Sequence, residues 1–323
     1  MKKTATVLLV GYVIVAPAWS AAQQAIVKSP PDTTAREIAG VVAGGARVQL
    51  IRDLFQSTEG PIAMPDGSLL FTEQDAGDGA LVRIDKDGNV STYLENTNRT
   101  IGLAYDPRGR LIGAQSRIPR VAVLAPERTT LASDYGGQPL VSPTDLVVDR
   151  KGGIYFGDQI STRFRPAPAG SKPRLFYIQP DGRLVVVSEE VTRPNGVMLS
   201  PDERILYATN GPVIVAFDVS PDGSLRNARD FVTLADLPRD EKGVVMGAAD
   251  GLAVDAAGRL YAATGVGVQV FSPQGQHLGT IPIPMPPQSI AFAGPDKTTL
   301  YVVGRGAVWK IDMIAQGLPG RAK

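Results

Sequence analysis

The sequence has no cysteine, a single histidine and no excess of charge of either sign. Without cysteine the chain has no thiol nucleophile and no cysteine-ligated metal site. A serine–histidine–acid triad is disfavoured, because His277 falls in a predicted outer strand. Lys and Arg number 33 against 32 Asp and Glu, so the chain lacks the basic stripe that binds nucleic acid.

Helical periodicity is also missing beyond the N-terminus, and no G-x-G-x-x-G turn opens a helix, which leaves nucleotide binding without support. The hydrophobic fraction is 43%, which is ordinary for a globular protein. These residues form short apolar runs separated by glycine, proline and aspartate, as in Pro180-Asp181-Gly182. This pattern predicts an all-β fold.

The apolar runs recur as one repeat, whose clearest copy is residues 250–264. Copies begin at residues 60, 102, 145, 196, 251 and 289, in steps of 42, 43, 51, 55 and 38. An all-strand repeat of roughly 40 to 50 residues is typical of propeller blades. We therefore predict a six-bladed β-propeller over residues 46–317, with four antiparallel strands per blade and a tail at 318–323. A short strand at Val48–Ile51 is predicted to complete the last blade and close the ring.

Residues 1–22 have the features of a cleavable signal peptide. Lys2 and Lys3 precede an apolar run from Val7 to Val15, and small residues lead to a cut before Gln23. We therefore expect a periplasmic or secreted protein, free of the membrane after cleavage, with a linker at residues 23–45. The alternative is an uncleaved membrane anchor.

One position in the repeat carries polar side chains. The first strand of each blade lines the central channel, so equivalent residues form a ring about one axis. The residues just before the apolar strands are Glu59, Ile101, Thr144, Asn195, Asp250 and Gln288. Carboxylate, amide and hydroxyl oxygens are the ligands of a hard divalent cation, so this ring predicts a Ca²⁺ site. The alternative is that each polar residue merely enters a strand and faces water.

At these residues the sequence resembles the senescence marker protein/gluconolactonase/luciferin-regenerating-enzyme-like family. The motifs are Thr58-Glu59-Gly60-Pro61, Arg193-Pro194-Asn195-Gly196 and the stretch 249–255, with a looser match at 142–156. The resemblance implies a six-bladed propeller that binds a divalent metal, usually calcium, and often hydrolyses lactones. By resemblance, Glu59, Asn195 and Asp250 match the metal ligands, and Asp250 also matches the general base.

Two positions depart from the family pattern and bear on the substrate. Members usually carry Asn where Thr144 stands and often a substrate-contacting Arg where Ser142 stands. Ile101 adds an apolar wall to the channel. We therefore assign Thr144, Ser142 and Ile101 to substrate binding and expect a less polar lactone or ester than a sugar lactone.

The sequence thus predicts a metal-dependent lactonase, in which the cation polarises the carbonyl and Asp250 activates water. The long connections 159–173 and 237–249 are candidate lids or slack surface loops. Two other functions stay open. One is a non-catalytic exported propeller that binds a ligand or partner protein. The other is a different activity on this scaffold, such as a lyase, an esterase or a phosphotriesterase.

Overall fold

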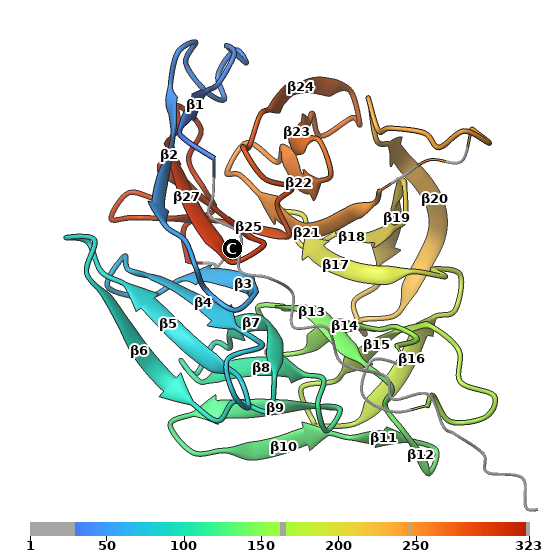
Figure 1. Cartoon of the computed structure of the whole chain (residues 1–323). Helices are drawn as coiled ribbons and strands as arrows, with labels where there is room; N and C mark the ends of the chain where they lie inside the picture. The colour runs from blue at the N-terminus through green and yellow to red at the C-terminus, as the bar shows by residue number, and fades with distance from the viewer. Residues whose placement is uncertain (1–29, 162–165, 244, 246, 321–323) are drawn as a thin grey trace, which may run out of the picture.

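The computed structural model describes residues 30–161, 166–243, 245 and 247–320. Six antiparallel sheets stand around a central axis like blades, and this confirms the predicted six-bladed β-propeller (Figure 1). No described residue lies in a helix. Accordingly, none of the described segments forms an apolar helix long enough to cross a membrane.

Each blade follows the same path, from an inner strand at the axis to an outer strand at the rim. Blade 1 contains β3 (Thr58–Ala63), β4 (Leu69–Glu73), β5 (Ala80–Ile84) and β6 (Val90–Glu95). Blade 2 contains β7 (Thr100–Tyr105), β8 (Leu111–Gln115), β9 (Arg120–Ala125) and β10 (Thr129–Ala132). A small hairpin of β11 (Asp134–Tyr135) and β12 (Gln138–Pro139) follows.

The second half of the ring repeats the pattern. Blade 3 contains β13 (Pro143–Val148), β14 (Ile154–Asp158), β15 (Arg174–Ile178) and β16 (Leu184–Ser188). Blade 4 contains β17 (Pro194–Leu199), β18 (Ile205–Asn210), β19 (Val213–Val219) and β20 (Leu225–Thr233). Blade 5 contains β21 (Ala249–Val254), β22 (Leu260–Thr264), β23 (Gly267–Phe271) and β24 (His277–Ile281).

The sixth blade takes strands from both ends of the chain. It contains β25 (Ser289–Ala293), β26 (Thr299–Gly304), β27 (Ala307–Asp312), β2 (Arg47–Arg52) and β1 (Thr33–Thr34). Strand β2 pairs with β27, and Figure 1 shows the blue and red ends of the chain side by side. The predicted closing strand is therefore confirmed. By pairing with β27, β2 joins the N-terminal and C-terminal parts of the chain in one sheet and covers an edge of β27 that would otherwise be unpaired.

The inner strands of blades 1 to 5 share a local irregularity. Their pairing with the second strand slips near the axis, where the inner strand holds one extra residue. The slips fall between Glu59 and Ile62, Thr100 and Leu103, Pro143 and Leu146, Pro194 and Val197, and Ala249 and Leu252. A bulge re-aims side chains, so these blades turn equivalent residues toward the channel. The inner strand of blade 6 has no such slip, because β25 pairs with β26 in continuous register.

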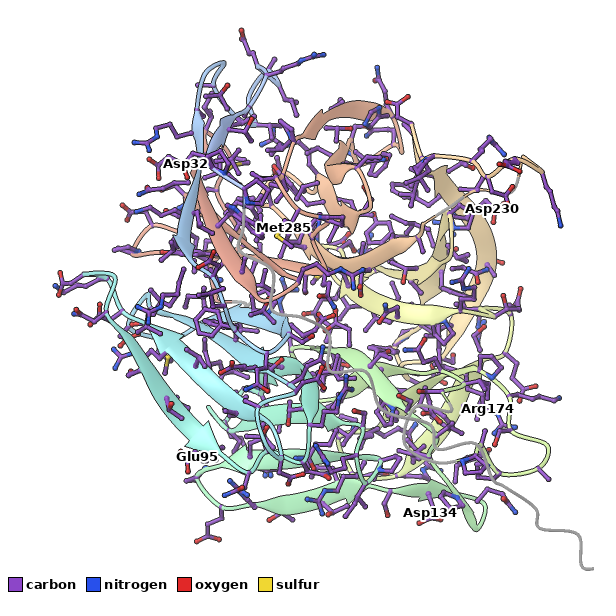
Figure 2. All side chains as sticks on the ribbon, in the orientation of Figure 1. Asp32, Glu95, Asp134, Arg174, Asp230 and Met285 are labelled. Atoms are coloured by element: carbon purple, nitrogen blue, oxygen red, sulfur yellow. The ribbon has the colours of Figure 1, made fainter. Side chains whose placement is uncertain are left out.

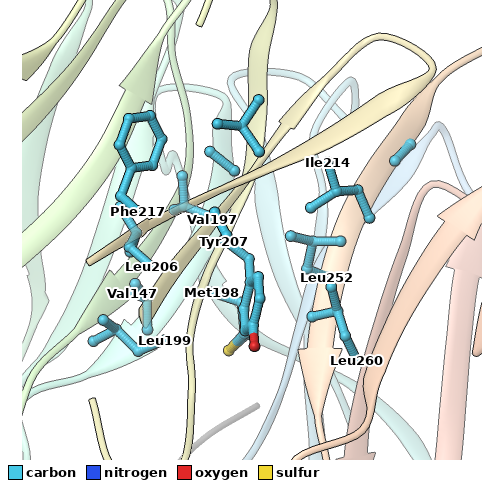
Figure 3. Packing of buried hydrophobic residues seen from close by; sticks show 14 of the residues in the cluster. Val147, Val197, Met198, Leu199, Leu206, Tyr207, Ile214, Phe217, Leu252 and Leu260 are labelled. Atoms are coloured by element: carbon cyan, nitrogen blue, oxygen red, sulfur yellow. The ribbon is translucent and has the colours of Figure 1, made fainter. Parts of the chain in front are cut away.

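Apolar side chains fill the space between blades. Figure 3 shows one such cluster, where Val197 and Leu206 of blade 4 pack near Leu252 and Leu260 of blade 5. Charged side chains such as Glu95, Asp134 and Asp230 lie toward the rim (Figure 2). Burial between neighbouring sheets therefore fixes the blades around the axis, where the inner strands can hold polar groups.

The N-terminal segment packs more closely than a linker would. Within residues 30–45, Ile38, Val41 and Val42 are buried in a cluster with the last two blades. The C-terminal segment binds to the same region, because the N–H groups of Ile314 and Ala315 donate to the carbonyl of Val41. The predicted signal peptide lies outside the described residues.

Candidate functional site

The predicted ring residues lie at the same mouth of the channel. Ile101, Thr144, Asn195 and Asp250 occupy the unpaired part of the bulges in β7, β13, β17 and β21. Glu59 lies at the start of β3, and Gln288 directly precedes β25. Because the inner strands of neighbouring blades contact one another, these side chains come together from all around the ring.

Glycines allow the inner strands to approach this closely. A Cβ atom on Gly196 would overlap the carbonyl oxygen of Asp250 in the next blade. A Cβ on Gly60, whose φ of 51° is left-handed, would likewise overlap the carbonyl oxygen of Ile101. The residue after each ring position must therefore be small in these blades, which explains the recurring glycine after Glu59, Ile101, Asn195 and Asp250.

Hydrogen bonds join three of the predicted residues in series. Asn195 donates from Nδ2 to Oδ1 of Asp250 at 2.6 Å. The hydroxyl of Thr144 donates toward the carbonyl of Asn195 at 3.0 Å. Thr144 is fully buried, whereas Asn195 and Asp250 are half-buried. Thr144 thus supports the backbone of Asn195 from the preceding blade.

Glu59 is buried beside other acids. Burial raises the pKa of Glu59 well above its ordinary value, and the charges of Asp250 and Asp145 raise it further. Gln288 opposes this shift by donating from Nε2 to Oε1 of Glu59 at 2.8 Å. A positive charge at this mouth would offset both the desolvation and the repulsion between carboxylates.

Asp145 is a site residue that the sequence analysis missed. It stands where blades 1, 2, 4 and 5 have glycine, and its side chain is buried. Its Oδ1 accepts a hydrogen bond from the N–H of Leu146 at 3.0 Å. A carboxylate in a position that four of the other five blades fill with glycine is the signal that could have identified it.

The other two predicted substrate residues lie nearby. Ile101 is half-buried and leaves one side of the ring without a polar side chain. Ser142 is buried just before β13, and its N–H donates to Oδ1 of Asp158 at 2.6 Å. Ser142 therefore sits on a rigid part of blade 3, while its assignment to substrate binding stays a prediction.

The oxygen atoms available here suit calcium better than zinc. Within the described residues, no group of three or more histidine, cysteine, aspartate or glutamate side chains is arranged to hold a metal ion. A cation at this mouth would therefore depend on an amide as well as carboxylates. Because Asn195 uses its Nδ2 on Asp250, its Oδ1 is the atom that could ligate, together with Glu59 and Asp250.

A cavity lies at the other end of the channel. It has a volume of about 630 Å³ and is lined by Met64, Tyr105, Val148 and Leu318, among others. None of the predicted site residues lines it. Its charged groups are engaged locally, as in the ion pair of Asp106 with Arg110. The two mouths therefore differ in chemistry: the buried Asp106 at this end is paired with an arginine, whereas Glu59 at the other end lies beside other acids.

Comparisons with known proteins agree with this architecture. A gluconolactonase of Zymomonas mobilis is 27% identical over 281 residues, which cover 79% of this chain and 78% of the relative. A pentonolactonase of Haloferax volcanii is 26% identical over 289 residues, covering 81% and 92%. The solved structure of a gluconolactonase from Xanthomonas campestris matches with a TM-score of 0.74 and 27% identity, covering 89% of this chain and 99% of that one.

The family assignment rests on a match that spans most of the propeller. Residues 57–305 match the model of the SMP-30/Gluconolactonase/LRE-like region. That stretch runs from just before Glu59 to the last hairpin and includes every predicted site residue. The chain therefore belongs to the SMP-30/Gluconolactonase/LRE-like family.

Proposed function

We propose that this protein hydrolyses a lactone with the help of a divalent cation, most plainly Ca²⁺. The observation that carries the proposal is the pairing of acids and amides at one channel mouth, with Glu59 buried there. Glu59 is bonded to Gln288, and Asp250 is bonded to Asn195. Relatives named gluconolactonase and pentonolactonase align over about four-fifths of the chain, which supports the same reaction class here.

The residues fit a cation on electrostatic grounds. The carboxyls of Glu59 and Asp250 lie close enough for one charge to raise the pKa of the other group. Buried like charges are stable only when a cation or a proton compensates them. Glu59, Asp250 and the amide oxygen of Asn195 would hold the ion. When bound, a divalent cation supplies a positive charge that stabilises the oxyanion developing on the lactone carbonyl.

The proposed chemistry of the chain's own residues centres on Asp250. Its carboxylate accepts a proton from the attacking water while the water oxygen bonds to the carbonyl carbon. The ring C–O bond then breaks, and the proton passes from Asp250 to the leaving alkoxide. The hydrogen bond from Asn195 to Oδ1 fixes the orientation of the Asp250 carboxylate. The product is the open-chain hydroxy acid.

We further propose a substrate less polar than a sugar lactone. Ile101 presents an apolar side chain between the polar members of the ring. Ser142 has no charge with which to grip a polyhydroxylated ring. A small alkyl-substituted lactone therefore fits this mouth better than one that carries many hydroxyls.

A lactone panel tests the proposal. The purified protein would be assayed on gluconolactone, pentonolactones and alkyl-substituted γ- and δ-lactones, with Ca²⁺ and after treatment with a chelator. We expect turnover that disappears on chelation and returns with Ca²⁺, with higher kcat/KM on the alkyl lactones. Turnover unaffected by chelation would contradict the metal dependence. No turnover on any lactone would favour a binding propeller.

We also propose that the protein is exported. The support is the charged start and apolar run of residues 1–22. Expression of the full chain in a Gram-negative host should yield mature protein in the periplasm or medium, beginning at Gln23. Full-length protein retained in the membrane fraction would instead indicate an uncleaved anchor.

A further inference from the structure

Gln288 stands at one of the three ring positions, with Ile101 and Thr144, that supply no candidate metal ligand. Its side chain joins two partners, donating from Nε2 to Oε1 of Glu59 at 2.8 Å and accepting at Oε1 from the N–H of Arg305 at 2.8 Å. A backbone N–H can only donate, so the carbonyl end of the amide must face Arg305. The NH₂ end is therefore directed at Glu59.

The backbone of Gln288 reaches the second acid of the site. Its N–H donates to the carbonyl of Val303 at 2.8 Å, within the closing blade. Its carbonyl accepts from the N–H of Gly251 at 2.8 Å, and Gly251 directly follows Asp250. One residue thus contacts the side chain of Glu59 in blade 1 and the backbone beside Asp250 in blade 5.

The turn that holds Gln288 is itself fixed. Arg305 and Gly306 form the hairpin turn between β26 and β27, with left-handed φ angles of 53° and 83°. The carbonyl of Gly306 accepts from the N–H of Phe55 at 3.0 Å, and a Cβ on Gly306 would overlap the carbonyl oxygen of Phe55. Phe55 lies on the segment that leads into β3, so the turn and the strand of Glu59 are held together.

We propose that Gln288 is a positioning residue for the cation ligand Glu59, and this inference rests on the proposed metal-dependent function. The amide holds Oε1 of Glu59 and thereby orients the carboxylate toward the cation. Holding the carboxylate in one rotamer removes entropy that cation binding would otherwise have to remove. The closing blade thereby contributes to cation affinity without touching the ion.

A neutral amide suits this role better than a charged side chain. A lysine in this position would neutralise Glu59 and repel a cation, while a glutamate would add another negative charge beside Glu59. The amide donates one hydrogen bond and leaves the net charge of the mouth unchanged. Substrate is not expected to contact Gln288, so its loss should weaken cation binding and spare the chemical step.

The decisive measurement is Ca²⁺ binding by calorimetry to the metal-stripped wild type and to Gln288→Met. Methionine has a similar volume and lacks the donor. We expect a Kd about 10- to 100-fold weaker, the usual cost of removing a group that orients a ligand. With saturating Ca²⁺, kcat on the best lactone should return to within about twofold of the wild type. Gln288→Asn, whose amide is too short to reach both partners, should weaken binding in the same direction.

The matched control is Gln269→Met in blade 5. Gln269 is buried and bonds through its amide to the backbone of Ala235, away from Glu59. This variant should lower the melting temperature and keep the Ca²⁺ affinity of the wild type. Equal Kd values for wild type and Gln288→Met would overturn the role of Gln288 alone. Absence of Ca²⁺ binding by the wild type would overturn both this role and the proposed metal dependence.

Discussion

Blades 1, 4 and 5 differ from blades 2, 3 and 6 in the side chain that each presents to the channel mouth. Blades 2 and 3 carry the same bulge as blades 4 and 5, at the same place in the inner strand. Yet blades 1, 4 and 5 present Glu59, Asn195 and Asp250, while the others present Ile101, Thr144 and Gln288.

The difference shows how a symmetric scaffold acquires an asymmetric site. We call the side chains of blades 1, 4 and 5 the first set and those of blades 2, 3 and 6 the second set. The second set places no charged side chain in the ring, but two of its members form hydrogen bonds to the first set. Thr144 reaches the backbone of Asn195, and Gln288 reaches the carboxylate of Glu59. Ile101 makes no such bond and gives the mouth one apolar side. In the proposed function, the first set would bind the cation and activate water. The second set would orient the first set and select the substrate.

Changing Asp250 to Asn should have the largest effect on activity of any substitution in the first set. The substitution keeps size and shape but removes the proton acceptor, and general bases contribute about 10²- to 10⁴-fold to rate. We expect kcat to fall by that factor on any active lactone, with the circular dichroism spectrum unchanged. The same change at Asp134, on the exposed hairpin β11–β12, is the control and should leave kcat unaltered. Wild-type turnover by Asp250→Asn would remove Asp250 from the role of base.

Changing Glu59 to Gln should affect the cation more than the fold. Loss of a charged ligand should weaken Ca²⁺ binding by at least about 10-fold, measured by calorimetry on metal-stripped protein. In chelator, the variant should melt at a higher temperature than the wild type, because the buried charge is gone. If Ca²⁺ affinity did not change, Glu59 would not be a ligand.

The raised pKa of Glu59 predicts a dependence of stability on pH in the metal-free protein. The folded state binds this proton more tightly than the unfolded state, so stability is greatest below the ordinary pKa of 4.5 and falls as pH rises toward the raised value. Urea unfolding in chelator, from pH 4.5 upward, should show this decline, and Ca²⁺ should reverse it. Glu59→Gln should show a shallower decline. Parallel curves for the two proteins would contradict the assignment.

Changing Thr144 to Val tests the second set with the smallest expected effect. Valine keeps the shape and removes the hydroxyl that bonds to the carbonyl of Asn195. The free energy of unfolding should fall by about 1 kcal/mol, as for a typical hydrogen bond. Ca²⁺ affinity should fall by less than in Gln288→Met, because Thr144 holds backbone and not a ligand atom. Thr130→Val, on the exposed part of β10, is the control for the substitution itself.

Most of the fold could be predicted from the sequence, because the repeat shows how the strands are spaced and which residues occupy equivalent positions in different blades. The phase placed Glu59, Asn195 and Asp250 at one mouth, and the run Val48–Ile51 identified the strand that closes the ring. The bulges were not predicted. A slip in pairing depends on two strands at once, and the apolar pattern of one strand does not record it.

The supporting contacts were also beyond the sequence. Gln288 and Glu59 are 229 residues apart, and no local pattern links them. Asp145 escaped notice because it begins an apolar run, and its proximity to Glu59 arises only when the ring is closed. The packing of Ile38 and Val41 onto the last blades was missed for the same reason, since their neighbours lie far along the chain.

The pairing of β2 with β27 has a consequence for how the molecule is made. Strand β2 pairs with β1 on one side, but its other edge must wait for β27, more than 250 residues later. Until then β2 is an exposed edge, and such long-range pairing is slow to form. Ring closure is therefore a late event in folding, and an incomplete chain would remain open to pairing with its neighbours. Glu59 and Gln288 also meet only at that step, so a cation site that includes Glu59 would report that synthesis and closure are both complete.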